Sequence, residues 1–256
     1  MQLSIIVLTC SQPEVTLRLF NAIDPLIRGK ALSLEPWEVV MIDNGSDDAS
    51  YPAISALTSG WGNMFTLISS PENVGVARGR NLGLQKCKGE YILILDNDTI
   101  PSAEAIEGLI SHMKQSPECG LAAPSLIAPD GTLQNSAKPF PGILQKIRHL
   151  FSSKTSPSER EAMQALHPFY LIGACQMISR NSLSHVGMLD PEIFFGPEDA
   201  DFCIRMRKAG FTVDYLPSLS IIHDWQRSSR KRPFSRQSRL HAKALLYFYF
   251  KHKRFL

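Results

Sequence analysis

The chain has 256 residues, of which 44% are hydrophobic and 20% are charged. This composition is typical of globular proteins and excludes the disordered, collagen-like and fibrous classes. No stretch approaches the roughly 20 apolar residues that a membrane-spanning helix requires, so we expect a soluble or peripheral protein.

Charge is distributed unevenly along the chain. Residues 227–256 contain ten Lys and Arg and no acid, whereas residues 1–226 contain 17 basic and 24 acidic residues. The basic segment also carries aromatic residues, which favours contact with an anionic membrane surface. We expect no nucleic-acid partner. The alternative is a solvated helix whose apolar side packs on the core, with these side chains turned inward: Leu245, Leu246, Phe248 and Phe250.

The five cysteines show no CxxC spacing and are odd in number. This pattern argues against a disulfide framework and against a zinc ribbon. Residues 3–10 lack the basic flank and the cleavage site of a secretory signal, and we interpret them as a strand. We therefore expect a cytoplasmic protein, whose attachment to the inner face of the cytoplasmic membrane depends on the basic tail.

The first half of the chain alternates strands and helices. Apolar, β-branched runs predict strands at residues 4–10, 39–43, 65–69 and 91–95. Apolar residues at helical spacing predict helices that end near Ile27, Leu57 and Cys87, and a fourth that Ser102 caps. This order predicts an α/β fold with a Rossmann-like, mostly parallel sheet that has helices on both faces. Such sheets bind ligands at the carboxyl ends of their strands.

The second half of the chain is less regular. Residues 128–168 contain five prolines, and long irregular segments are usually functional or mobile. Beyond this segment we predict a strand over residues 170–179, a helix over 198–208, and short strands over 211–215 and 219–223.

Two carboxylates, Asp96 and Asp98, directly follow the apolar strand 91–95. At the open end of a central strand they require a counter-charge. Their oxygens suit Mg²⁺ or Mn²⁺, which would leave positions for phosphate oxygens. The alternative is a turn and helix cap, because Asp and Asn favour turns.

A glycine-rich segment, residues 73–83, contains Arg78 and Arg80 at the start of a predicted helix. Small residues permit close backbone approach, and arginines at a helix N-terminus attract phosphate oxygens. The segment matches neither GxGxxG nor GxxxxGK[ST], which gives nicotinamide and P-loop sites little support. The alternative is a helix packed tightly on the sheet.

Two further polar side chains follow strands. Asp43 is placed to accept a hydrogen bond from the imide N–H of uracil or thymine, or to form an Asx turn instead. His223 follows the last strand and suits a metal or phosphate site, with a structurally satisfied histidine as the alternative. Trp225 is either a platform for a sugar or part of the core.

Three acids, Glu198, Asp199 and Asp201, stand at the start of the helix predicted over 198–208. Acids stabilise this end of a helix, but three exceed what a cap needs. Asp199 and Asp201 do not share a helix face, so we expect one to act at a site and the other to pair with a residue such as Arg205. The apolar residues 193–195 would desolvate a carboxylate, raise its pKa and suit it to act as a general base.

Together these segments resemble the inverting family 2 glycosyltransferases with the GT-A fold. The resemblance rests on SIIVLTC, VVMIDNGSDD, NVGVARGRN, the strand before Asp96 and FFGPEDADFCIRMRKAGF, in the order of that family, and it covers nearly the whole chain. The segment from Leu171 onward is particularly similar to bacterial, rhamnosyltransferase-like members that build cell-surface polysaccharides.

The resemblance implies a single GT-A domain over residues 1–226, with a nucleotide-binding half (1–125) and an acceptor half (126–226), followed by a basic helix or tail at 227–256. It also implies three groups of site residues. These are nucleotide-binding Thr9, Asp43, Arg80 and Asp96, metal-binding Asp96, Asp98 and His223, and the catalytic base Asp199 supported by Glu198.

The activity implied is transfer of one sugar, with inversion, from a UDP- or dTDP-linked donor to a glycan or lipid-linked glycan, aided by Mg²⁺ or Mn²⁺. The chain lacks the QxxRW motif of processive synthases, which disfavours repeated addition.

Two alternative functions remain. A sugar-nucleotide pyrophosphorylase would carry a glycine-rich basic loop after the first strand, where this chain has Thr9 to Pro13. A catalytically inactive nucleotide-sugar-binding protein of the same fold would be expected to lose the acids.

Overall fold

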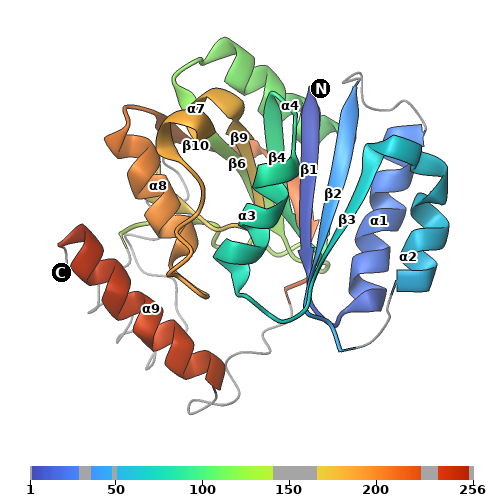
Figure 1. Ribbon diagram of the computed structural model, residues 1–256. Helices are drawn as coiled ribbons and strands as arrows, with labels where there is room; N and C mark the ends of the chain where they lie inside the picture. Colours follow the sequence, from blue (N-terminus) through green and yellow to red (C-terminus); the bar gives the residue numbers. More distant parts are fainter. Residues whose placement is uncertain (1, 29–35, 48–50, 141–165, 226–235, 254–256) are drawn as a thin grey trace.

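The computed structural model describes residues 2–28, 36–47, 51–140, 166–225 and 236–253. An eight-stranded, mostly parallel sheet with the order β3-β2-β1-β4-β9-β6-β10-β5 forms its centre. Helices cover both faces of this sheet (Figure 1). The predicted α/β fold is therefore confirmed.

The strands of the large sheet are β1 (Leu3–Thr9), β2 (Trp37–Asn44), β3 (Phe65–Ser70), β4 (Tyr91–Asp96), β5 (Thr99–Ile100), β6 (Cys119–Ile127), β9 (Cys175–Ser179) and β10 (Thr212–His223). A small second sheet pairs β7 (Ala137–Lys138) with β8 (Tyr170–Leu171). The helices are α1 (Pro13–Arg28), α2 (Tyr51–Thr58), the 3₁₀ helix η1 (Ser59–Met64), α3 (Val76–Lys86), α4 (Ala103–Gln115), α7 (Arg180–Val186), α8 (Glu198–Lys208) and α9 (Arg236–His252).

Both faces of the sheet are buried, which explains the continuous apolar runs in its strands. In β1, Leu3, Ile5 and Val7 belong to the core that α1 and α4 complete. Ile6 belongs to the opposite core, to which α3 and α8 contribute.

The sheet differs from the sequence prediction in three of its longer strands, and the two-residue strand β5 was not predicted either. β6, which we did not predict, lies between β9 and β10. β9 runs antiparallel to β4 and β6, and it is only the second part of the run 170–179, because a turn separates it from β8. The strands expected at 211–215 and 219–223 form one strand, β10, whose register shifts between Leu216 and Ser220. Sheet pairing, which local patterns do not report, decides all three.

The glycines of α3 serve its packing on the sheet. A Cβ atom on Gly79 would lie 2.6 Å from Leu8 Cδ1, and one on Gly83 would lie 2.8 Å from Ile6 Cγ2. The alternative of a helix packed tightly on the sheet is therefore confirmed for these two residues. This close approach also brings Arg80, which lies between them in the sequence, to the sheet.

The C-terminal helix α9 packs on α8. Phe248 and Tyr249 are buried against Ala200 and Ile204 of α8, and Leu245 packs against the same cluster. Leu246 and Phe250 are 56% and 68% exposed. Inward packing of the apolar side chains is thus confirmed for Leu245 and Phe248 and is wrong for Leu246 and Phe250, which lie on the outer face of the helix.

Residues 227–235 and 254–256 of the basic tail, and residues 141–165 of the irregular segment, lie outside the described residues. Among the helices of the described ranges, none has the length and apolarity needed to cross a membrane.

Candidate active site

The predicted site residues gather at the end of the sheet where β1, β2 and β4 finish. In the β1–β2 pair Thr9 stands opposite Asp43, and in the β1–β4 pair Leu8 stands opposite Asp96. The short strand β5 then pairs Thr99 with His223 of β10. This pairing brings the turn that carries Asp98 beside the end of β10.

Asp96, Asp98 and His223 form a cluster that fits a divalent cation. One ligand atom from each lies within 4.8 Å of the other two. Asp98 Oδ1 is buried and accepts no hydrogen bond from the described residues, although His223 Nε2 lies 3.4 Å away. A buried carboxylate oxygen without a donor is costly unless a cation faces it. Two carboxylates and an imidazole suit Mg²⁺ or Mn²⁺.

Gln134 orients the imidazole of His223. Its Oε1 lies 2.7 Å from His223 Nδ1, and its Nε2 donates to the His223 carbonyl oxygen at 2.7 Å. The Nδ1 atom therefore donates to Oε1, and Nε2 faces Asp98. The neighbouring Trp225 is 52% exposed and stacks on His223, so it is not part of the core.

Arg80 links the cation cluster to the acids of α8. Its guanidinium donates from Nη2 to Asp96 Oδ1 at 2.6 Å and to the Gly173 carbonyl oxygen at 2.9 Å, and from Nη1 to Asp199 Oδ1 at 3.3 Å. Burial alone would lower the pKa of this guanidinium, but the charges of Asp96, Asp199 and Glu198 raise it. Arg80 is therefore a fixed positive charge that holds Asp96 and Asp199 in place.

Glu198 is buried and Asp199 is largely buried, and both have raised pKa values. Burial raises the pKa of Asp199 to about 6, against the lowering effect of Arg80. Burial and the charge of Asp199 raise the pKa of Glu198 to about 8. Arg80 contacts Asp199 directly and favours the ionised form of its carboxylate. An ionised, partly desolvated carboxylate with a pKa near 6 suits a general base.

Asp201 points away from this pair, as expected. It lies 2.8 Å from Arg205 Nε, 2.6 Å from Lys251 Nζ and 2.9 Å from His252 Nε2, and it is fully buried. The predicted pairing with Arg205 is confirmed. Asp201 therefore ties α9 to α8.

We expect Asp201→Asn to destabilise the fold while the chemistry persists. Removing one partner of a buried ion-pair network costs about 3 kcal/mol, a fall in Tm of roughly 6–12 °C for a domain of this size. Thermal unfolding followed by circular dichroism measures the fall. Sugar transfer by the folded variant should stay within about threefold of the unchanged protein. A variant that keeps its Tm but loses transfer would move the catalytic role to Asp201.

The remaining predicted residues already have hydrogen-bond partners. Asp43 accepts hydrogen bonds from the backbone N–H and the hydroxyl of Ser46, which form a turn. The Thr9 hydroxyl lies 2.7 Å from that of Thr16. Asn97, between the two acids, donates to Thr9 at 3.3 Å and to Thr16 at 3.0 Å. The structure brings Thr9 and Asp43 to the edge of the site, and their roles in nucleotide binding stay predictions.

Sequence patterns missed Gly173 and Gln134. Gly173 donates its N–H to Asp199 Oδ2 at 2.8 Å, and a Cβ atom on it would lie 2.4 Å from Asp199 Oδ1. A glycine that interrupts the apolar run 170–179 is the signal that could have found it. Gln134 lies in the irregular segment, where no pattern marks it.

Comparisons with known proteins identify the family to which the chain belongs. The sequence profile of glycosyl transferase family 2 matches residues 4–187. The N-acetylglucosaminyl-diphospho-decaprenol L-rhamnosyltransferase of Mycobacterium tuberculosis is 23% identical over 240 residues, which cover 83% of this chain and 74% of that protein. The poly-beta-1,6-N-acetyl-D-glucosamine synthase of Staphylococcus aureus is 24% identical over 195 residues, which cover 76% of this chain and 44% of that protein.

Solved structures show the same fold. GalNAc-T7 with UDP, GalNAc and Mn²⁺ superposes with a TM-score of 0.67 at 18% identity, covering 97% of this chain and 50% of that chain. The mannosyltransferase PcManGT from Pyrobaculum calidifontis, with GDP-Man and Mn²⁺, gives a TM-score of 0.64 at 15% identity, covering 89% of this chain and 58% of that chain. The chain thus spans between half and three-fifths of these structures. Since the family profile matches more than half of the chain, the chain belongs to glycosyl transferase family 2 and is a glycosyltransferase with the GT-A fold.

Proposed function

We propose that the protein transfers one sugar, with inversion and with the aid of a divalent cation, from a UDP- or dTDP-linked donor to a glycan or lipid-linked glycan of the bacterial cell surface. One observation carries this proposal. Arg80 contacts both Asp199 and Asp96, so the candidate base and the candidate cation site share one guanidinium. The relatives named for a lipid-linked rhamnosyltransferase and a polysaccharide synthase support the class of acceptor.

The cation cluster would hold the leaving group. Asp96, Asp98 and His223 would bind Mg²⁺ or Mn²⁺, whose charge stabilises a departing nucleoside diphosphate. Arg80 holds the carboxylate of Asp96 in place, and Gln134 keeps the imidazole of His223 oriented. Thr9 and Asp43, at the adjoining ends of β1 and β2, would border the nucleotide, with Asp43 on the pyrimidine base.

Asp199 would act as the base in a single displacement. Its carboxylate takes the proton of the acceptor hydroxyl while that oxygen forms a bond to the anomeric carbon. The bond from this carbon to the diphosphate oxygen breaks on the opposite face, so the configuration inverts. The Gly173 N–H and Arg80 hold the carboxylate in one orientation. A positioned base contributes about 10²–10⁴ in rate, and positioning and leaving-group stabilisation supply the rest.

Neither of the two alternative functions, a sugar-nucleotide pyrophosphorylase or an inactive nucleotide-sugar-binding protein, is favoured. A pyrophosphorylase is opposed by the family match over residues 4–187. An inactive binding protein is opposed by acids that remain buried and oriented at the site, with the pKa of Asp199 raised to about 6.

A thermal-shift screen tests the proposal. Pyrimidine and purine nucleotide-sugars are added with and without Mn²⁺, because a ligand that binds only the folded state raises Tm. We expect a UDP- or dTDP-sugar to raise Tm only when Mn²⁺ is present. An equal increase without the metal would contradict the proposed cation site.

The pH dependence of transfer should report Asp199. Since its raised pKa is about 6, kcat/KM should fall about tenfold per pH unit below that value and level off above it, because protonation removes the base. The measurement uses saturating Mn²⁺, so that the metal ligands stay loaded across the range. A rate that stays constant from about pH 5 to about pH 7.5 would contradict the role of Asp199.

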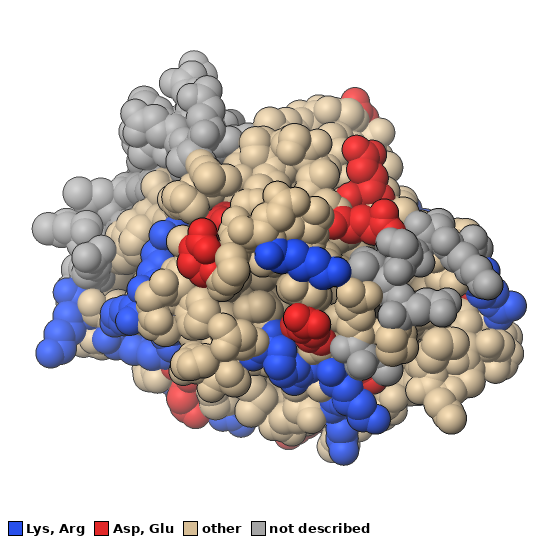
Figure 2. Space-filling model, turned by 90° about the horizontal axis from the view of Figure 1, so that it is seen from above, with Lys and Arg blue, Asp and Glu red and all other residues tan. Residues whose placement is uncertain are grey.

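The outer face of α9 supports attachment to an anionic membrane surface. Exposed Leu246 and Phe250 stand one helical turn apart, and Lys243 and Lys253 are exposed at the two ends of the same stretch. Basic side chains also gather on the side of the molecule where α8 and α9 lie (Figure 2). This arrangement is typical of a helix that lies in a membrane interface. It would bring the site to a lipid-linked acceptor at the cytoplasmic face.

Vesicle co-sedimentation tests this attachment. We expect binding to anionic vesicles that weakens at high salt, since each basic group near such a surface contributes about 1 kcal/mol. The double variant Leu246→Ser and Phe250→Ser should lower the affinity for vesicles by at least about tenfold, because burial of each of these apolar side chains contributes about 1 kcal/mol or more. Leu133→Ser, which alters an exposed leucine elsewhere, is the control and should bind normally. Equal binding to neutral and anionic vesicles would refute attachment through α9.

A further inference from the structure

Two clusters of His, Cys, Asp or Glu in the described part of the chain are close enough to surround one metal ion. One is Asp96, Asp98 and His223. The other consists of His112 in the last turn of α4, Cys119 at the start of β6, and Asp214 near the start of β10. The proposed sugar transfer uses no residue of this second cluster.

The second cluster lies far from the candidate active site. In the β6–β10 pair, Asp214 stands opposite Ala122 and Ile222 stands opposite Ile127. These two β6 residues are five positions apart, which is roughly 17 Å along an extended strand. Cys119 and Asp214 lie near the amino ends of β6 and β10, whereas the active-site acids follow the carboxyl ends of strands. Figure 2 views the end of the molecule at which the parallel strands begin.

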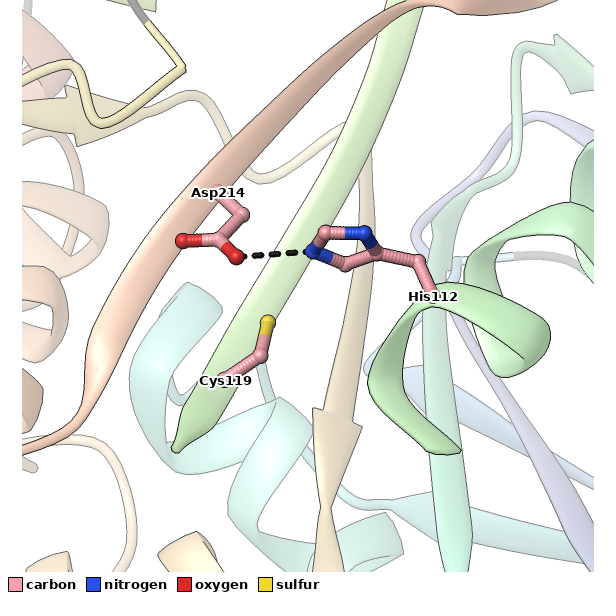
Figure 3. Close-up of side chains that lie close together, drawn as sticks. All are labelled: His112, Cys119 and Asp214. Atoms are coloured by element: carbon pink, nitrogen blue, oxygen red, sulfur yellow. Dashed lines mark hydrogen bonds and ion pairs between the residues drawn. The ribbon is translucent and has the colours of Figure 1, made fainter. Parts of the chain in front are cut away.

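The three side chains point into one space between α4, β6 and β10 (Figure 3). Their ligand atoms all lie within 4.8 Å of one another, and His112 Nε2 is 2.7 Å from Asp214 Oδ2. Cys119 and Asp214 are 1% and 2% exposed. The side chain of His112 is 23% exposed, which gives an ion a path from solvent.

Asp214 is a buried carboxylate with a histidine on each oxygen. His112 contacts Oδ2, and His167 Nδ1 lies 2.8 Å from Oδ1. A buried carboxylate requires a positive partner, and an imidazole supplies one only in its protonated form. A bound divalent cation would supply that charge without a proton on either imidazole. His167, on the far oxygen, would then orient the carboxylate as a supporting partner.

We propose that His112, Cys119 and Asp214 form a second metal site, one that takes Zn²⁺ or a divalent cation of the same class. Nitrogen, sulfur and oxygen together are a donor set that zinc prefers and that Mg²⁺ does not. Zinc–ligand distances of about 2.0–2.3 Å place tetrahedral ligand atoms roughly 3.3–3.8 Å apart, so shifts of about 1 Å assemble the site. Binding releases the thiol proton of Cys119 and replaces the hydrogen bond between His112 and Asp214. Water completes the coordination, and the ion fastens the end of α4 to two strands.

Cobalt titration of the metal-stripped full chain tests this site. Cobalt bound to a thiolate absorbs in the near ultraviolet, and the active-site donors Asp96, Asp98 and His223 include no sulfur. We expect this absorption to saturate at one Co²⁺ per chain, to disappear on addition of Zn²⁺, and to be absent in Cys119→Ala. The control Cys10→Ala, which alters the cysteine at the end of β1, should keep it. The absorption should also persist in Asp98→Asn, which disables the other cluster.

A variant of His112 keeps the test decisive if Cys119→Ala does not fold. His112→Gln, on the partly exposed side of α4, should weaken Zn²⁺ binding by at least tenfold in a competition titration. In the Asp98→Asn background, in which the active-site cluster is disabled, Zn²⁺ should also raise the Tm, and the further change His112→Gln should remove this increase. The absence of thiolate absorption with Co²⁺, or its persistence at equal affinity in the Cys119 and His112 variants, would overturn the proposal.

Discussion

Replacing Asp199 with asparagine is expected to lower the rate of sugar transfer by roughly two orders of magnitude or more and to leave donor affinity nearly unchanged. An asparagine accepts the hydrogen bond from the Gly173 N–H that Asp199 accepts at 2.8 Å. Its amide cannot take a proton from an acceptor hydroxyl. Single-turnover transfer and calorimetric titration of the donor measure the two effects separately.

Asp201→Asn is the matched control, because it makes the same change two residues away on the same helix. Asp201 faces Arg205, Lys251 and His252 and lies away from Arg80. Normal transfer by Asp199→Asn, together with an inactive but folded Asp201→Asn, would show that the base is Asp201.

Replacing Asp98 with asparagine is expected to abolish metal-dependent nucleotide binding. The substitution keeps the shape of the side chain and removes the charge from Oδ1, the buried atom that accepts no hydrogen bond within the described ranges. We expect the affinity for UDP or dTDP in the presence of Mn²⁺ to fall at least about a hundredfold, since one ligand of three is lost. Isothermal titration calorimetry measures the fall.

The control for this variant is Asp130→Asn, which removes the same charge from an exposed turn. It should bind the nucleotide and Mn²⁺ normally. Unchanged affinity in Asp98→Asn would exclude Asp98 from the site. A fall of equal size in both variants would attribute the loss to net charge and leave no specific role for Asp98.

Sequence patterns predicted the parts of the fold that depend on local structure. The helix predicted over 198–208 is α8 with the same bounds, and Ser102 caps α4 by accepting from the Ala105 N–H at 3.1 Å. The cation cluster was also predictable, because Asp96, Asp98 and His223 each follow or end a strand that patterns mark clearly. Parallel strands place such residues at one edge of the sheet.

The features of the fold and the site that sequence patterns did not predict depend on contacts between segments distant in sequence. β6 has no periodicity of its own and is a strand because β9 and β10 flank it. Arg80 was predicted as a nucleotide ligand, but its buried contacts with Asp96 and Asp199 depend on α3 lying close to the sheet. His112, Cys119 and Asp214 are brought together from three elements, and no spacing in the sequence relates them.

We expect sugar transfer by this chain to require a divalent cation bound by Asp96, Asp98 and His223. The most direct measurement is product formation from the nucleotide-sugar that the thermal-shift screen identifies, with a lipid-linked glycan acceptor. It is made with Mn²⁺, after chelation, and after Mn²⁺ is restored. We predict that product formation stops on chelation, resumes with Mn²⁺, and fails to resume in Asp98→Asn. Product formation at the same rate in chelator as in Mn²⁺ would contradict the account.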